Sequence, residues 1–270
     1  MLDIRNVTKT FNAGTANEVR SLQGITLKVD HGSFVTVIGT NGSGKSTLLN
    51  AIAGTFKLDK GQILIDNTDV TNWDEHKRAK YVGRVFQNPL SGTAPNLTIA
   101  ENLSLAALRG QSRGLSKALR NDFRDRMINS VKSLGMGLEG RLNNIIGSLS
   151  GGQRQALTLI MATYLRPQLL LLDEHTAALD PKSADQVIKI TDRVVTQNKL
   201  TTFMVTHSMQ QAVTYGDRVI MLHRGKIAHD FKGKDKKRLR VDDFLAMFEE
   251  IRRADLLDET AADLLRKNYV

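Results

Sequence analysis

Short runs of apolar and β-branched residues alternate with turn residues over the first 75 positions, a pattern typical of strands joined by tight connections. The run over 33–38 is almost continuously apolar, as expected for a strand buried on both faces of a parallel sheet. It ends abruptly at Gly39, so a glycine-rich loop follows this buried strand directly. The strands predicted in this part of the chain are 3–7, 26–29, 33–38 and 62–65.

From residue 96 to about 135, apolar residues recur at every third or fourth position, which predicts a helical insert. Strand and helix then alternate again, with a helix expected from 152 to about 165 and strands over 169–172, 202–206 and 218–222. Together these elements predict an α/β fold with an α-helical subdomain. The apolar positions of the insert are Leu103, Leu105, Ala106, Leu108, Phe123, Met127, Val131 and Leu134.

The C-terminal part begins with a hairpin turn at Arg224 and Gly225. The segment 232–240 carries six basic residues and one acid, a composition that favours a solvated loop. An acidic helix start follows, and four apolar side chains then share one helix face, so we expect a tail helix docked on the core. These four are Phe244, Leu245, Phe248 and Ile251.

Composition and length exclude several classes of protein. The 270 residues are 41% hydrophobic and 24% charged, which excludes disorder and collagen, and the length excludes two tandem enzymes. The absence of cysteine excludes disulfides, thiol catalysis and cysteine-ligated zinc or iron. With no apolar run of about 18 residues and no secretory pattern over residues 1–12, we expect an intracellular chain that does not itself span a membrane. The net charge of +10 is compatible with binding to nucleic acid, to an anionic membrane or to a nucleotide, and it does not distinguish between these partners.

Residues 39–46 read GTNGSGKS and match the phosphate-binding loop pattern in full, between a predicted buried strand and a helix. Glycines there let successive amide N–H groups surround the β-phosphate, and the helix N-terminus adds positive potential. Lys45 would hold the β and γ oxygens, Ser46 would ligate magnesium, and Thr47 would assist at the α-phosphate. The expected nucleotide-binding residues are Gly39, Asn41, Gly42, Ser43, Gly44, Lys45, Ser46 and Thr47.

Asp173 and Glu174 follow an apolar run at the point where a strand should end. Ligands of open α/β folds bind at that carboxyl edge of the sheet, and two adjacent residues aim their carboxylates differently. We expect Asp173 to reach magnesium through water and Glu174 to polarise the water that attacks the γ-phosphate. Taken alone, two acids after a strand could instead cap a helix.

Residues 149–153 read LSGGQ, about a hundred residues after Lys45 and just before an apolar helix. With the phosphate loop before it and Leu171-Leu172-Asp173-Glu174 behind it, the chain resembles an ATP-binding cassette (ABC) ATPase over roughly residues 2–231. At this helix start, the hydroxyl of Ser150 and the backbone amides of the two glycines that follow it would form a second anion site. The residues expected to contact nucleotide there are Ser150, Gly151, Gly152 and Gln153.

The resemblance implies that two such chains sandwich two ATP molecules head to tail, most simply as a homodimer. It identifies Gln87 as a catalytic and magnesium-binding glutamine, Asp180 as part of the loop that meets nucleotide across the dimer, and His207 as the switch histidine that bridges the γ-phosphate and Glu174. Phe11 stands where the family offers an aromatic ring to adenine. His175 stands where many relatives have proline, which leaves both carboxylates intact.

The expected fold is therefore a P-loop NTPase core of the RecA-like type with an antiparallel β-subdomain and an α-helical subdomain. Residues 1–231 would form the cassette, with the helical subdomain inserted at about 89–156, and residues 232–270 a basic linker and helical extension. The expected catalytic residues are Glu174, His207 and Gln87, and the expected magnesium ligands are Ser46, Gln87 and Asp173.

The resemblance points to the ATPase subunit of a bacterial importer for a small solute such as an amino acid, at the cytoplasmic face of the membrane. Its partners would be a second ATPase subunit, transmembrane permease subunits contacted through 89–96, and an extracytoplasmic substrate-binding protein, while the chain itself would not touch cargo. The alternative is a soluble ABC ATPase acting on nucleic acid or ribosomes. The single cassette and the absence of a long coiled coil argue against this alternative. A third class, a nucleotide kinase, shares the phosphate loop but would have no use for residues 149–153 or His207.

Overall fold

The computed structural model describes residues 1–110 and 121–269, and a six-stranded sheet forms its centre. The strand order is β10-β9-β3-β8-β7-β6, with β10 antiparallel to β9 and every other neighbouring pair parallel. All six residues of β3 are buried, as the apolar run predicts. The strands are β3 (Phe34–Gly39), β6 (Val82–Val85), β7 (Leu169–Asp173), β8 (Thr201–Val205), β9 (Arg218–His223) and β10 (Lys226–Lys232).

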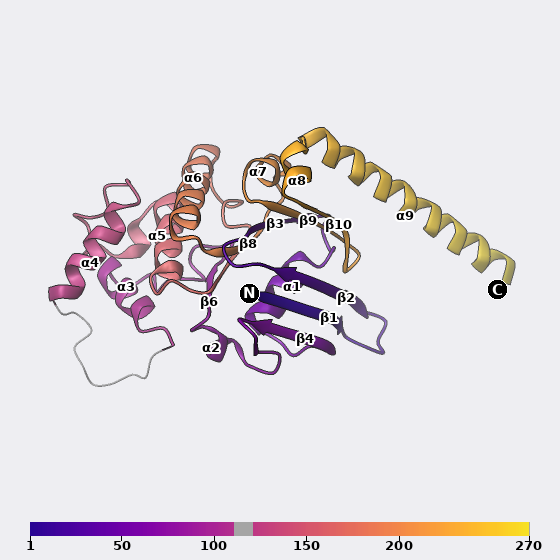
Figure 1. Cartoon of the computed structure of the whole chain (residues 1–270), viewed down its shortest axis with the longest axis horizontal. Coiled ribbons are helices and arrows are strands. Elements are labelled where there is room, and N and C mark those ends of the chain that lie inside the picture. Colours follow the sequence, from indigo (N-terminus) through magenta and orange to yellow (C-terminus); the bar gives the residue numbers. More distant parts are fainter. Residues whose placement is uncertain (111–120, 270) are drawn as a thin grey trace.

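A second sheet is antiparallel, with the order β2-β1-β4-β5, and lies on one side of the central sheet. Its strands are β1 (Leu2–Phe11), β2 (Val19–Val29), β4 (Lys60–Ile65) and β5 (Thr68–Asp69). Helix α1 (Lys45–Ala53) lies between the two sheets, and its buried leucines share one core cluster with residues of both (Figure 1). The helix that follows the phosphate loop is therefore held from two sides.

The opposite face of the central sheet is covered by helices, which confirms the predicted helical subdomain. Leu103, Met127 and Val131 are fully buried in this cluster, whereas Leu105 and Leu108 are exposed and the side chain of Phe123 lies outside the described residues. The helices are α3 (Ile99–Ala107), α4 (Asn121–Lys132), α5 (Gly151–Thr163) and α6 (Pro181–Asn198), with a 3-10 turn at Ile146–Ser148.

The C-terminal segment is more ordered than its basic composition indicates. The prediction of a solvated loop is wrong for α8 (Lys234–Arg238), where Lys236 is buried and its Nζ donates to the carbonyl of Val213 at 2.6 Å. A lysine can lie there because its aliphatic stem packs while the ammonium reaches a buried carbonyl. Burial lowers the pKa of Lys236, against the opposing effect of Asp217.

Helix α9 (Val241–Tyr269) docks on the core through its first turns and then runs away from both sheets (Figure 1). Phe244 is fully buried against Ile38 and Met221, with Phe248 and Ile251 partly buried beside it, as predicted. Leu245 is 47% exposed and does not share their buried face. Two shorter helices are α2 (Glu75–Arg78) and α7 (Met209–Thr214). Within the described ranges, no helix is both long and apolar enough for a bilayer crossing.

A buried arginine joins α1 to the segment before β6. Arg78 is 1% exposed, and its guanidinium donates to the carbonyls of Ala51 and Ile52, both at 2.8 Å, and to those of Thr71 and Trp73. The first two belong to the last turn of α1, where carbonyls lack helical partners. Burial lowers the pKa of Arg78 to about 10, so the side chain stays charged at neutral pH.

We expect Arg78→Met to lower the free energy of unfolding by about 3 kcal/mol, because four carbonyls lose a charged donor at a buried site. Urea unfolding measures this change. The matched control is Lys77→Met, at an exposed position on the same helix, which should change stability by less than about 0.5 kcal/mol. Equal unfolding curves for the two variants would contradict the assigned role of Arg78.

Candidate active site

The phosphate loop lies between the end of β3 and the start of α1, as its sequence predicts. It borders a cavity of about 360 Å³. The structure brings residues 41–47 of the loop together there with Glu174 from the end of β7 and His207 from the end of β8. Val19 and Ser21 of β2 complete the lining. Three segments that are far apart in the sequence thus meet at one edge of the central sheet.

Two glycines of the loop exclude any side chain. Gly39 has φ +154°, and a Cβ there would collide with the carbonyl of Leu222. Gly44 has φ +100°, and a Cβ there would lie 2.5 Å from the carbonyl of Ser21. The loop backbone is therefore pressed against β9 on one side and β2 on the other, in conformations that glycine adopts without strain. The loop residues Asn41 to Gly44, which follow this path, line the cavity.

Lys45 lies inside the loop that it follows. It is 6% exposed, and its Nζ donates to the carbonyls of Gly39 and Thr40, both at 2.9 Å. Burial lowers the pKa of Lys45, while the charges of Glu174 and Asp173 oppose that shift. In the described part of the chain, the buried Ser43 hydroxyl has no hydrogen-bond partner. The loop thus holds a cation and a hydroxyl with unused bonding capacity, which suits a phosphate group.

The two carboxylates after β7 point to different partners, as predicted. Glu174 Oε1 contacts His207 Nε2 at 2.6 Å, and the Glu174 side chain is 12% exposed. Its backbone has φ +46°, a left-handed conformation that is rare for a residue with a side chain, and its N–H donates to the carbonyl of Val205. Such a conformation persists where the surrounding structure fixes it, often at functional sites.

Asp173 faces β6, where it meets a residue that sequence reasoning missed. Arg84 Nη2 contacts Asp173 Oδ2 at 3.3 Å and donates to Asn50 Oδ1 at 2.6 Å, and its guanidinium lies 4.6 Å from the Phe86 ring centroid. The only signal in the sequence is that Arg84 and Phe86 lie two positions apart, just before Gln87. Arg84 thereby positions the Asp173 carboxylate.

The second anion site lies elsewhere in the same chain. Ser150 is the N-cap of α5: its Oγ accepts from the N–H of Gln153 at 3.2 Å, and the Gln153 side chain accepts from the N–H of Ser150. Ser150 and Gly151 are exposed, and Gly152 is buried. These residues lie outside the lining of the phosphate-loop cavity. One copy of the chain therefore does not bring its two predicted anion sites together.

The remaining predicted site residues also lie outside that lining. Gln87 is exposed just after β6. Asp180 caps α6 by accepting from the N–H of Ser183 at 3.0 Å, and hydrogen bonding by the side chain of Ser183, together with its N–H, lowers the pKa of Asp180. The Phe11 ring packs edge-on against Phe56 with centroids 5.4 Å apart. Phe11 also pairs across the strands with Val19, whose exposed side chain lines the cavity.

A buried glutamine connects the second anion site to the segment before Gln87. Gln155 of α5 is fully buried, and its Nε2 donates to the carbonyl of Phe86 at 3.0 Å. Sequence reasoning missed this residue because its partner lies 69 positions away. Helix α5 is thus hydrogen-bonded directly to the backbone next to Gln87.

His175, next to Glu174, is a buried structural residue. It is 2% exposed, and its Nε2 hydrogen-bonds to Thr191 Oγ1 at 2.9 Å. Burial lowers the pKa of His175 to about 4, because the apolar surroundings disfavour the charged ring.

This depressed pKa predicts a specific acid sensitivity. The unfolded chain binds a proton at this residue below pH about 6.5, whereas the folded chain does so only below about 4, so its stabilising contribution is complete above pH about 6.5 and is lost as the pH falls toward 4. Between pH 7 and 4.5 we expect wild type to lose about 2 kcal/mol more than His175→Gln. Urea unfolding at both pH values measures this, and His76→Gln, at an exposed position, should keep the wild-type slope.

Comparisons with known proteins agree with this geometry. The family model described as "ABC transporter" matches residues 22–177. The chain is 45% identical to a "Tyrosine transport ATP-binding protein" of Clostridioides difficile (strain R20291), over 92% of this chain and 99% of that protein. It is 31% identical to the "Spermidine/putrescine import ATP-binding protein PotA" of Aggregatibacter actinomycetemcomitans, over the whole of this chain and 68% of that protein.

Solved structures of ATP-binding cassettes share the fold. A dimeric post-hydrolysis state of MJ0796 bound to ADP and Pi superposes with a TM-score of 0.73 and 30% identity, covering 86% of this chain and 98% of that one. The ADP conformation of MJ1267, a cassette of an ABC transporter, gives a TM-score of 0.74 at 25% identity, covering 88% and 93%.

Proposed function

The chain belongs to the ABC transporter family and is the ATPase subunit of such a transporter, and we propose that it powers bacterial import of an amino acid, with tyrosine as the first candidate. The cargo part of the proposal is supported by the printed name of the 45% identical relative, which covers nearly the whole chain. The ATPase chemistry assigned to individual residues is carried by one observation: Glu174 and His207 are in contact at the cavity of the phosphate loop.

In the proposed mechanism, the loop amides and Lys45 bind the phosphates of ATP, with Lys45 exchanging its carbonyl partners for phosphate oxygens. Glu174 accepts a proton from the water that attacks the γ-phosphate, as its place at the carboxyl edge of the sheet allows. His207 orients the Glu174 carboxylate and contacts the γ-phosphate. Phe11 offers its ring to adenine.

Magnesium is part of the proposal, and the donors present suit it. Ser46 is exposed at the start of α1 and lines the cavity, Asp173 lies at the end of β7, and Gln87 follows β6. Ser46 and Gln87 would hold the ion through their hydroxyl and amide oxygens, and Asp173 would reach it through a water, which gives the hard oxygen ligands that Mg²⁺ prefers. When bound, the ion neutralises phosphate charge.

A second copy of the chain would complete each site. The exposed N-cap at Ser150 and the glycine amides after it form an anion site that the chain does not place at its own phosphate loop. In a head-to-tail homodimer, the segment Ser150, Gly151, Gly152 and Gln153 of each copy closes over the ATP of the other, with Asp180 beside it.

A separate groove supports the permease contact that we propose. It holds about 770 Å³ between the central sheet and the helical subdomain, and is lined by Ser91–Ala94 together with the exposed leucines Leu105 and Leu108. A groove that is lined by exposed leucines and by part of the segment 89–96 suits a helix of a transmembrane subunit. This contact would hold the chain at the cytoplasmic face of the membrane, and an extracytoplasmic binding protein would deliver the cargo.

Two variants separate binding from hydrolysis. Lys45→Ala should weaken ATP binding by more than about 100-fold because the phosphates lose their buried cation, whereas Glu174→Gln should retain binding and slow hydrolysis by at least about 100-fold. Binding of a fluorescent ATP analogue and release of inorganic phosphate measure the two effects. Full-speed hydrolysis by Glu174→Gln would refute the role of Glu174, and unchanged affinity of Lys45→Ala would refute the phosphate-loop assignment.

Cargo is tested by uptake in cells that express the chain with its permease. We expect uptake of labelled tyrosine that is lost with Glu174→Gln, and uptake of labelled spermidine that is the same with either form. Spermidine uptake that depends on Glu174 would replace the amino-acid proposal with a polyamine importer like the PotA relative.

Affinity purification of the tagged chain from membranes and cytosol tests the importer proposal as a whole. Recovery of the chain only with ribosomes or nucleic acid would contradict that proposal.

A further inference from the structure

We propose that Asp255 of α9 is a positioning residue for nucleotide binding, acting through the turn between β9 and β10 on the phosphate loop. The inference rests on the proposed binding of ATP at residues 39–47 and adds the C-terminal helix to that site. Three consecutive links of hydrogen bonds, ion pairs and backbone contact join Asp255 to the loop.

The first link joins the turn to the phosphate loop. The N–H of Gly225 donates to the carbonyl of Ser43 at 3.0 Å. A Cβ placed on Gly44 would lie only 3.5 Å from the Cα of Gly225, so the two backbones are in close contact. The turn therefore forms the outer support of the loop at the two residues before Lys45.

The second link fixes the turn itself. Gln23 of β2 donates its N–H to the carbonyl of Gly225 and its side-chain Nε2 to the carbonyl of Arg224, both at 2.8 Å. Arg224 has φ +43° and Gly225 has φ +74°, so both central residues are left-handed. Such a turn favours glycine at both positions, and an arginine in it costs about 1 kcal/mol. Contacts of Arg224 therefore help to keep the turn in this conformation.

The third link joins the turn to α9. Asp255 Oδ1 contacts His223 Nε2 at 3.0 Å and Arg224 Nε at 3.1 Å. One carboxylate oxygen thus bonds to the last residue of β9 and to the first residue of the turn. The Asp255 side chain is only 28% exposed, so its bonds are partly shielded from water.

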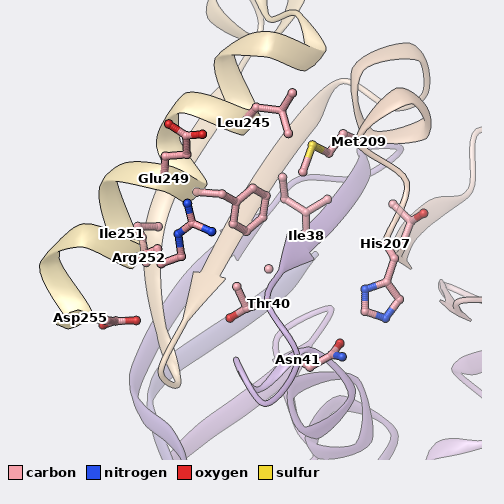
Figure 2. A pocket seen from close by; sticks show the side chains of 13 residues that line it. Ile38, Thr40, Asn41, His207, Met209, Leu245, Glu249, Ile251, Arg252 and Asp255 are labelled. Carbon is pink, nitrogen blue, oxygen red and sulfur yellow. The ribbon is translucent and has the colours of Figure 1, made fainter. Parts of the chain in front are cut away.

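Figure 2 shows Asp255 on the stretch of α9 that lines a cavity beside the phosphate loop. A cavity of about 690 Å³ separates the middle of α9 from the phosphate loop, with Arg252 and Glu249 on the helix side and Thr40 and Asn41 on the loop side. The apolar docking of α9 runs from Phe244 to Ile251 and so ends about one helical turn before Asp255. Asp255 is thus the polar contact by which this later part of α9 reaches the turn that supports the loop.

The geometry predicts an effect on affinity rather than on the chemical step. Asp255 supports the backbone of Ser43 and Gly44 through the turn, whereas Glu174 and His207 are carried by β7 and β8. In the full-length chain, Asp255→Ala should raise the dissociation constant of a fluorescent ATP analogue and the KM for ATP by about three- to tenfold, with kcat within about twofold of wild type. The matched control is Glu250→Ala, an exposed acid on the same helix, which should leave both constants unchanged.

A double-mutant cycle tests the route. In a His223→Ala, Arg224→Ala background, Asp255→Ala should weaken binding much less than it does in wild type, because both contacts that it removes are already lost. Circular dichroism monitors folding, and Asp255→Asn replaces Asp255→Ala if the latter does not fold. Wild type that fails to bind the analogue would overturn the proposed function itself. Wild type that binds, with Asp255 variants equal to Glu250→Ala, would overturn this inference alone.

Discussion

The parallel register of β3, β8 and β7 is the constraint on which the site depends. Val37 pairs with Val205, and Val205 pairs with Asp173, so three strand ends lie in one row at the same sheet edge. The residues that follow each strand therefore meet: the phosphate loop after β3, Glu174 after β7 and His207 after β8. A slip of one residue in any pairing would turn the side chains of that strand to the opposite face. Burial of β3 on both faces opposes such a slip, because both cores would be disturbed.

Helix α5 connects the parts of the chain that the proposed cycle must coordinate. Its N-cap and first turn, Ser150 to Gln153, form the proposed second anion site, and its Gln155 is hydrogen-bonded to the backbone beside Gln87. Farther along, Thr158 and Met161 line the groove proposed for the permease. A rigid helix thus extends from the surface that would meet a second copy to the surface that would meet the membrane partner. The proposed role of Asp255 would also connect the C-terminal helix α9 to the nucleotide site.

Sequence reasoning succeeded where the signal is local. The strand over 33–38, the glycine loop and the two acids at 173–174 each lie within a few adjacent residues, and their positions in the fold follow from pattern alone. The left-handed backbone of Glu174 and the contact of Arg84 with Asp173 depend on pairings across the sheet, the latter between residues 89 positions apart. Strand β6 was not predicted because it is four residues long and contains a glycine and an arginine. The basic run was misjudged because burial of Lys236 depends on a carbonyl of α7.

We propose that one chain holds two half-sites, which a second copy unites around ATP. Sedimentation velocity of the Glu174→Gln variant, with and without MgATP, tests it most directly, because this variant should bind nucleotide without turning it over. The account predicts a monomer without nucleotide and a dimer carrying two ATP molecules when MgATP is present. A variant that stays monomeric while saturated with ATP would contradict it.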